Sequence, residues 1–232
     1  MLNWAARYFP ILRVLKQQLA ETDSLLEIGS GSVGIGKFRH APFVGCDISF
    51  PFRPKAPMRP VVASGTMLPF GDRSFDAVVA SDVLEHVPPD RRGALIQEVL
   101  RVTRKVAIFG FPCGPRAFAY DQMLADAYDK IWQDRPVWLQ EHMLHPFPTE
   151  SMFDGLNQDW IVKSFGNESL DFHYWVMRKE MYRLWNYVFR VLLSALPRLI
   201  EGLLRRADRE PFYRKIVLVR RRSNSELLAV NP

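Results

Sequence analysis

The sequence predicts an α/β fold in which a parallel β-sheet carries helices on its faces. Short apolar runs of β type alternate with loops and helical stretches between residues 24 and 111, and strands separated by crossovers are typical of parallel sheets. The clearest crossover is Pro89–Val102, where apolar residues recur at helical spacing. A length of 232 residues, with 48% hydrophobic and 24% charged residues, favours one globular domain with additions.

The expected elements are taken in chain order. An amphipathic helix at Asn3–Ala20 comes first and forms an N-terminal helical extension over residues 1–23. The α/β domain follows over 24–222, and residues 223–232 are predicted to be a flexible tail. Strands are expected at Leu25–Ile28, Phe43–Cys46, Val61–Ala63, Phe75–Ala80 and Val106–Phe111, with two late strands at Trp160–Phe165 and Pro211–Val219.

Two connections between the early strands cannot hold an ordinary α-helix. Only nine residues separate Gly34 from Val44, which is too few for an ordinary helix and its turns. Four prolines then repeat at every third position, Pro51, Pro54, Pro57 and Pro60. This spacing matches the turn of a polyproline II helix and excludes an α-helix. The segment is either a stiff surface connection or a PxxP ligand for a partner domain.

A glycine turn at the end of the first predicted strand is the strongest functional signal. Gly29 and Gly31 follow the apolar run Leu25–Ile28, and glycines there allow a ligand to approach the backbone closely. Asp47 ends the next strand, twenty residues after Glu27, where a carboxylate can accept hydrogen bonds from a ribose. A dinucleotide and S-adenosylmethionine both suit this geometry. Glu27 and the short helix after Gly34 disfavour a pyrophosphate and favour S-adenosylmethionine.

Three stretches in order resemble the class I S-adenosylmethionine-dependent methyltransferases, specifically the type 11 small-molecule branch. The first is Glu27-x-Gly29-x-Gly31, the second is Val44–Ser49, and the third and most specific is Leu68–Val87. The resemblance covers roughly residues 24 to 111. It implies a Rossmann-like class I methyltransferase sheet of seven strands, the last antiparallel, with S-adenosylmethionine as the cofactor.

The resemblance also implies the cofactor-binding residues. Glu27 acts on the methionine end, Asp47 holds the ribose, and Ser81 offers its backbone carbonyl to the cofactor amine. The chain departs from the family pattern at Val33, where a third glycine is frequent, and at Ser64, where an acidic residue is frequent. The full implied set is Glu27, Gly29, Ser30, Gly31, Asp47, Ile48, Ser64, Gly65, Thr66 and Ser81.

Two histidines are the candidate catalytic residues. His86 follows the fourth strand at the carboxyl edge of the sheet, where ligands of open α/β folds bind, and its alternative role is packing against the prolines that follow it. By resemblance, His145 closes over the acceptor from a later loop. A metal site built from His142, His145 and Glu141 is disfavoured by poor spacing, and no metal is predicted.

A long basic amphipathic helix over residues 172–206 is expected as an insertion in the methyltransferase domain. Four arginines lie within a narrow arc, opposite an apolar face that includes Leu184 and Leu199, and Pro197 is expected to kink the helix. This helix packs on its own domain, contacts an anionic membrane surface, or forms a dimer contact.

The predicted reaction moves a methyl group from S-adenosylmethionine to an oxygen, nitrogen or carbon atom of a small or lipid-linked acceptor. The net charge of +6 leaves RNA methylation open as an alternative, although no appended RNA-binding motif is present and nucleic acid is a disfavoured partner. The second alternative is a non-catalytic module that binds the cofactor. The chain has two cysteines and no uncharged apolar run long enough to span a membrane, which predicts a cytoplasmic protein. Peripheral attachment to the inner face of the membrane is the alternative that the basic helix leaves open.

Overall fold

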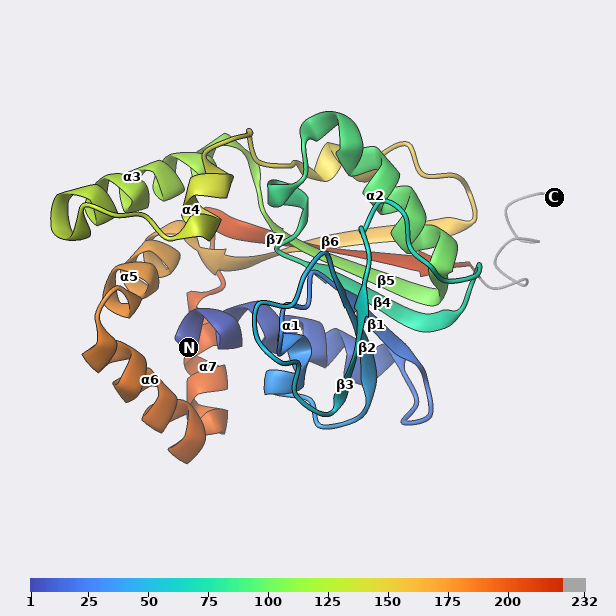
Figure 1. Ribbon diagram of the computed structural model, residues 1–232, viewed down its shortest axis with the longest axis horizontal. Coiled ribbons are helices and arrows are strands. Elements are labelled where there is room, and N and C mark those ends of the chain that lie inside the picture. The colour runs from blue at the N-terminus through green and yellow to red at the C-terminus, as the bar shows by residue number, and fades with distance from the viewer. Residues whose placement is uncertain (223–232) are drawn as a thin grey trace.

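The computed structural model describes residues 1–222, which form a seven-stranded sheet with helices on both faces (Figure 1). The strand order is β3-β2-β1-β4-β5-β7-β6. Strand β7 pairs antiparallel with both of its neighbours, and the pairs among β1 to β5 are parallel. The strands are β1 Leu25–Ile28, β2 Phe43–Asp47, β3 Met58–Val62, β4 Phe75–Ser81, β5 Thr103–Pro112, β6 Trp160–Ser169 and β7 Phe212–Arg221.

Seven α-helices and three short 3₁₀ helices connect the described strands. The α-helices are α1 Leu2–Gln18, α2 Pro89–Val102, α3 Gly114–Trp132, α4 Val137–His142, α5 Leu170–Glu180, α6 Arg183–Ala195 and α7 Pro197–Ala207. The 3₁₀ helices are η1 Gly34–Lys37, η2 Leu84–His86 and η3 Glu150–Phe153. Within residues 1–222, none of these helices combines the length and the apolar character that crossing a membrane requires.

Helices α1 and α2 bury opposite faces of the central strands. Successive strand side chains point to opposite faces of a sheet, so Leu25 packs with α1 and Leu26 packs with α2. The same alternation continues in β4, where Val78 joins the core on the α2 side and Val79 joins the core on the α1 side. Because both faces are covered, every residue of β1 and β4 is buried.

The predicted fold class is confirmed, and so are the main elements. The sheet has seven strands with an antiparallel β7, and α2 has the predicted bounds. The predicted strand Val61–Ala63 is wrong in its bounds, because β3 begins at Met58 and contains Pro60. The proline is accommodated because β3 is an edge strand, where a missing N–H group costs no ladder bond on the open side.

The prediction of one long helix over residues 172–206 is wrong. The chain forms α5, α6 and α7 instead, with a break before α6 and another at Leu196, so Pro197 is the first residue of α7. The face that is buried also differs from the predicted one: Leu184 and Leu199 are 69% and 56% exposed. The residues that pack against α1 and α5 are Phe189, Leu193, Ile200 and Leu204.

Helices α5, α6 and α7 lie at one end of the sheet, beside the beginning of α1 (Figure 1). Helix α1 contacts α5, α6 and α7 and also lies against the sheet. It therefore joins the helical end of the molecule to the core of the sheet. The predicted tail, residues 223–232, lies outside the described residues.

Candidate functional site

The turn after β1 depends on glycine at two positions. Gly29 has a φ of +69° and donates its N–H to the carbonyl of Cys46 at 2.8 Å. A Cβ atom at Gly29 would overlap the side chain of Val83. Gly34 has a φ of +51°, and a Cβ atom there would overlap the carboxylate of Glu27. Gly34 therefore allows η1 to approach β1 closely, one position after the place where the family has its third glycine.

Glu27 is buried behind this turn and is bonded to other parts of the chain. Its Oε1 accepts a hydrogen bond from the Tyr8 hydroxyl at 2.7 Å, and its Oε2 accepts one from the Ile35 N–H at 2.8 Å. The side chain thereby fixes α1 and η1 to β1. Burial raises the pKa of Glu27 to about 7, against the lowering effect of these two hydrogen bonds.

A cavity of about 740 Å³ opens at the carboxyl ends of β1 and β2, and we call it the edge cavity. Asp47 lies in its wall and accepts a hydrogen bond from the Gly31 N–H at 2.7 Å. Ile48 is 76% exposed and presents an apolar surface to the same cavity. The hydroxyl groups of Ser64 and Thr66 lie 2.9 Å apart in the loop that follows β3.

The edge cavity brings most of the predicted cofactor-binding residues together. Those that line it are Gly29, Gly31, Asp47, Ile48, Ser64, Gly65 and Thr66. Three others, Glu27, Ser30 and Ser81, are buried and do not line it. Their direct roles toward a cofactor stay predictions.

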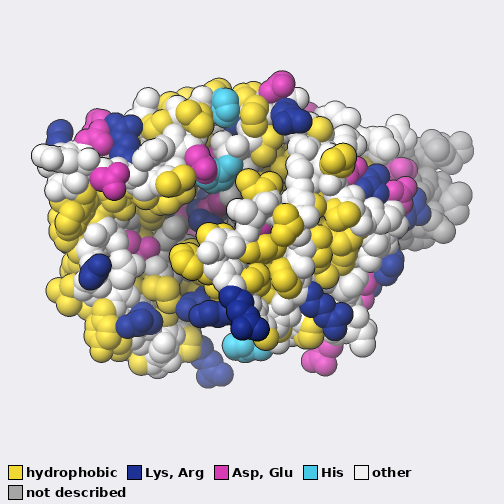
Figure 2. Space-filling model, viewed as in Figure 1, with side chains coloured by type: hydrophobic (Ala, Val, Ile, Leu, Met, Phe, Trp, Pro, Cys, Tyr) yellow, Lys and Arg dark blue, Asp and Glu magenta, His cyan; other side chains and the backbone are white. Residues whose placement is uncertain are grey.

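A second cavity of about 710 Å³ lies beside the first, and we call it the helical cavity. Its walls come mostly from α1, α3, α4, α5 and the beginning of β7, and partly from η1 and the loop before β3. Figure 2 shows the hollow in this face of the molecule, with charged side chains visible inside it. Aromatic and charged residues share the lining, among them Trp4, Tyr128, Trp138, Arg7 and Glu180.

Asp82, His86 and Trp138 line both cavities. His86 is therefore placed where a group bound in one cavity meets a group bound in the other. Its Nδ1 lies 2.8 Å from Oε2 of Glu141, and burial together with the nearby His142 lowers the pKa of its imidazole. The second catalytic candidate, His145, is half-buried and lines neither cavity.

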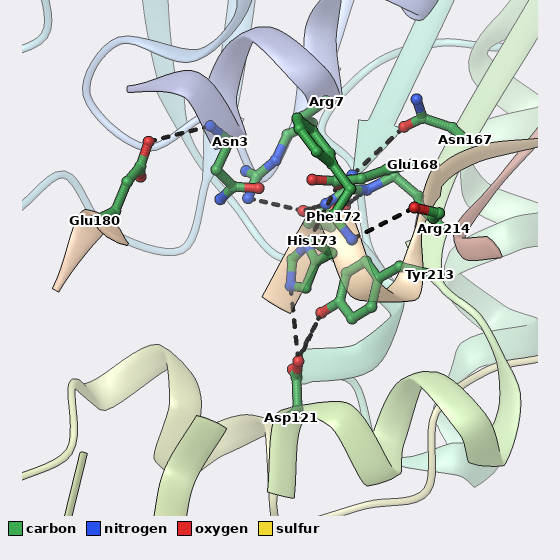
Figure 3. Close-up of polar contacts among 12 residues, drawn as sticks. Asn3, Arg7, Asp121, Asn167, Glu168, Phe172, His173, Glu180, Tyr213 and Arg214 are labelled. Atoms are coloured by element: carbon green, nitrogen blue, oxygen red, sulfur yellow. Dashed lines mark hydrogen bonds and ion pairs between the residues drawn. The ribbon is translucent and has the colours of Figure 1, made fainter. Parts of the chain in front are cut away.

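A buried network of charges, part of which lines the helical cavity, includes Arg7, Glu168 and Arg214 (Figure 3). Arg214, on β7, donates two hydrogen bonds of 2.9 Å to the carboxylate of Asp82 and a third of 2.9 Å to Glu168. Arg7, on α1, lies 2.7 Å from the same Asp82 carboxylate. Burial disfavours the charge of Asp82, but the two guanidinium groups outweigh it and hold the pKa of Asp82 well below its usual range.

Both carboxylates of this network have an uncommon backbone conformation. The φ angles are +52° at Asp82 and +62° at Glu168, a region that residues with a side chain rarely adopt. Such strain persists where surrounding contacts impose it, and the hydrogen bonds to Arg214 do so here.

Sequence reasoning missed this network as a site because nothing in the spacing marks it. Arg7 and Arg214 are 207 positions apart in the numbering, Arg7 in the predicted N-terminal helix and Arg214 next to Lys215 in a predicted strand. Only pairing of β5 with β7 and packing of α1 on the sheet bring the two together.

A second buried polar group adjoins the network and includes His142. The Nδ1 atom of His142 lies 2.6 Å from Oδ2 of Asp121, and the Tyr213 hydroxyl donates to the same carboxylate at 3.1 Å. His173 stacks on the Tyr213 ring with centroids 3.4 Å apart. Figure 3 shows His173 and Tyr213 directed toward Asp121.

Comparisons with known proteins agree with this geometry. Residues 26–111 match the family model described as methyltransferase domain. Two curated proteins, each named uncharacterized methyltransferase, from Mycobacterium sp. (strain KMS) and Mycobacterium sp. (strain MCS), are 56% identical to this chain over 46 residues. The match covers 20% of this chain and 18% of each relative, so it spans less than a fifth of the relatives' length.

Solved structures with the same architecture include two methyltransferases. The methyltransferase domain of bacterial CtHen1-C has a TM-score of 0.56 at 13% identity, covering 96% of this chain and 100% of that one. Magnesium protoporphyrin IX methyltransferase from Synechocystis PCC 6803, solved with bound SAH, has a TM-score of 0.51 at 10% identity, covering 95% of this chain and 84% of that one. The expected class I methyltransferase fold is therefore confirmed.

The raised pKa of Glu27 predicts a pH-dependent stability. Between its ordinary value of 4.5 and about 7, the unfolded chain releases this proton while the folded chain retains it. The free energy of unfolding therefore falls as pH rises through this window. Glu27→Gln lacks the effect, since its amide can accept from Ile35 and donate to Tyr8. We expect the stability of the variant relative to the original chain to rise by about 2–3 kcal/mol between pH 5 and pH 8.

Urea denaturation of both chains at the two pH values measures this difference. Groups that titrate alike in both chains contribute equally to the two free energies of unfolding, so their contributions cancel. Tyr8, Arg7 and Asp47 are the titratable groups around Glu27, and all three are unchanged by the substitution. A stability difference that does not vary with pH would show that the folded chain holds Glu27 ionised.

Proposed function

Residues 26–111 carry a methyltransferase domain, and we propose that the chain transfers the methyl group of S-adenosylmethionine to an oxygen, nitrogen or carbon atom of a small or lipid-linked acceptor. One observation carries the proposal: two cavities of about 740 and 710 Å³ share a wall made by Asp82, His86 and Trp138. The edge cavity takes the cofactor and the helical cavity takes the acceptor.

The edge cavity fits S-adenosylmethionine better than a dinucleotide. Asp47 supplies a carboxylate for ribose hydroxyls, Ile48 an apolar surface for the adenine, and the Ser64 and Thr66 hydroxyls lie beside it. A Cβ atom at Gly31 would meet no other atom within 4 Å, so the backbone there is open to a ligand. A pyrophosphate would find only the four-residue η1, which offers little helix dipole.

Bound S-adenosylmethionine supplies a methyl group on a positively charged sulfur. It would supply this methyl group to a lone pair of the acceptor, and the electron pair of the carbon–sulfur bond would stay with sulfur, which would become neutral. The chain's main contribution is to align the two reactants and exclude water. His86 lies at the shared wall, where its imidazole accepts the proton that an acceptor hydroxyl or amine loses.

Asp47→Ala tests the cofactor assignment. We expect calorimetry to show roughly tenfold to 100-fold weaker binding of S-adenosylmethionine, because hydrogen bonds to a charged group contribute about 1.5–3 kcal/mol. Asp47→Asn is the matched control, since an amide oxygen still accepts from the Gly31 N–H and preserves the turn. Unchanged affinity of the alanine variant would reject the ribose role of Asp47.

His86→Ala tests the catalytic assignment. An acceptor is first identified by mass spectrometry of cell extract incubated with the protein and isotopically labelled methyl donor. We then expect turnover to fall about 100-fold to 10,000-fold, with cofactor affinity preserved. His145→Ala is measured alongside, and a smaller loss is expected because His145 lines neither cavity. Undiminished turnover in the His86 variant would remove it from the mechanism.

We further propose that the outer face of α6 and α7 attaches to an anionic membrane surface. Leu184, Tyr187 and Val191 form an exposed stripe on α6, and Leu199 and Leu203 continue it on α7. Exposed arginines flank these residues: Arg183, Arg190, Arg198, Arg205 and Arg206. Apolar residues bordered by cations are typical of helices that lie in a membrane interface.

Liposome flotation tests this attachment. We expect the chain to float with vesicles that contain an anionic lipid, and the double variant Leu184→Glu, Leu199→Glu to remain in the lower fractions. Met67→Glu is the control, since Met67 is 76% exposed and belongs to another surface. Equal flotation of all three chains would contradict the proposal, and a change in gel-filtration volume of the double variant alone would point to a dimer contact instead.

A further inference from the structure

Three potential metal ligands meet beneath the shared wall of the two cavities. Glu85 and His86 belong to η2, and His142 is the last residue of α4. Each offers one ligand atom, and these atoms all lie within 4.8 Å of one another. We propose that Glu85, His86 and His142 form a binding site for a divalent transition-metal ion.

Glu85 gives the first independent indication of a missing partner. Its side chain is fully buried, and neither of its carboxylate oxygens has a hydrogen-bond partner within the described residues. Buried carboxylates are normally paired or hydrogen-bonded. The nearby cations Arg7 and Arg214 do not supply the missing partner, since they pair with Asp82 and Glu168.

The orientation of His142 gives the second indication of a missing partner. Its Nδ1 is engaged by the carboxylate of Asp121 at 2.6 Å, and Tyr213 in turn donates to Asp121. The other ring nitrogen, Nε2, faces Glu85 and lies 3.8 Å from its Oε1. A carboxylate on one nitrogen that leaves the other free is the usual support of a metal-binding histidine, because it fixes the tautomer and the ring orientation.

The donor set favours a borderline transition metal. Two imidazoles and one carboxylate suit Zn²⁺, Co²⁺ or Fe²⁺, whereas Mg²⁺ and Ca²⁺ prefer oxygen ligands throughout. Ligand atoms around Zn²⁺ lie about 3.3 Å apart, so binding requires the three ligand atoms, which lie within 4.8 Å of one another, to move closer together. His86 and His142 both line the helical cavity, so a remaining coordination position faces that cavity.

This site deepens the proposed function. It rests on that proposal because the helical cavity is there assigned to the methyl acceptor. A metal ion with three protein ligands retains a position for an exchangeable ligand. A bound ion would offer that position to an oxygen of the acceptor and would lower the pKa of its hydroxyl, so that the proton passes to water more readily. With the ion bound, His86 would hold it as a ligand, and the general-base role proposed above would apply to the metal-free chain.

A metal titration without cofactor or acceptor tests the site independently of methyl transfer. The full chain is stripped with a chelator and titrated with Co²⁺, whose visible absorption reports coordination, and with Zn²⁺ by calorimetry. We expect one ion per chain. Glu85→Gln and His142→Ala should each weaken binding by more than the 10-fold to 100-fold loss expected of Asp121→Asn, which removes only the support of His142.

His40→Ala is the control for incidental binding, because His40 is an exposed imidazole away from the cluster. Circular dichroism and thermal unfolding establish that each variant is folded. If Glu85→Gln or His142→Ala does not fold, His86→Ala serves in its place, since His86 is 29% exposed. No stoichiometric uptake, or unchanged affinity in the folded cluster variants, would overturn the metal site. Calorimetry of the cofactor would be unaffected by that outcome, so the two proposals fail separately.

Discussion

The buried guanidinium of Arg214 is the interaction on which the arrangement of the two cavities depends. It lies on β7 and binds Asp82, just after β4, and Glu168, near the end of β6, while Arg7 brings α1 to the same Asp82 carboxylate. Four segments from the beginning, middle and end of the chain therefore meet at one point. Moving these charges out of water has a large cost, which only close and complete pairing offsets. Loss of one partner would leave an uncompensated buried charge, so the network constrains the fold as a unit.

The pKa values of three buried carboxylates close to this point shift in different directions because their partners differ. Glu27 has two hydrogen bonds of its own, and burial nonetheless raises its pKa to about 7. Asp82 has two guanidinium groups, and its pKa is held low. Glu85 has neither, and its pKa is raised. Burial raises the pKa of all three, and only the two guanidinium groups beside Asp82 outweigh it.

The two cavities also differ in which part of the chain builds them. Most of the edge cavity comes from residues within 26–111, the segment that matches the methyltransferase family model. Most of the helical cavity comes from α1, α3, α4, α5 and β7, which lie outside that segment. The family match therefore covers most of the wall of the edge cavity and leaves most of the wall of the helical cavity outside it. Helices α6 and α7 pack against α1 and α5 and present other apolar and basic residues outward.

The sequence by itself determined the sheet, the glycine turn and the cofactor side of the site. Strand periodicity, the spacing of Gly29, Gly31 and Asp47, and the pattern of α2 are local signals, since they record which residues one element buries or exposes. Only the tertiary structure decided the break of residues 172–206 into three helices and the buried face of α6. It also brought Arg7 and Arg214 to the same carboxylate, that of Asp82. It also showed that the Glu27 carboxylate, which the family resemblance assigns to the methionine end of the cofactor directly or through water, is bonded to Tyr8 and Ile35. These features depend on contacts between segments far apart in the chain, and the free energy of such a contact is not a property of either segment alone.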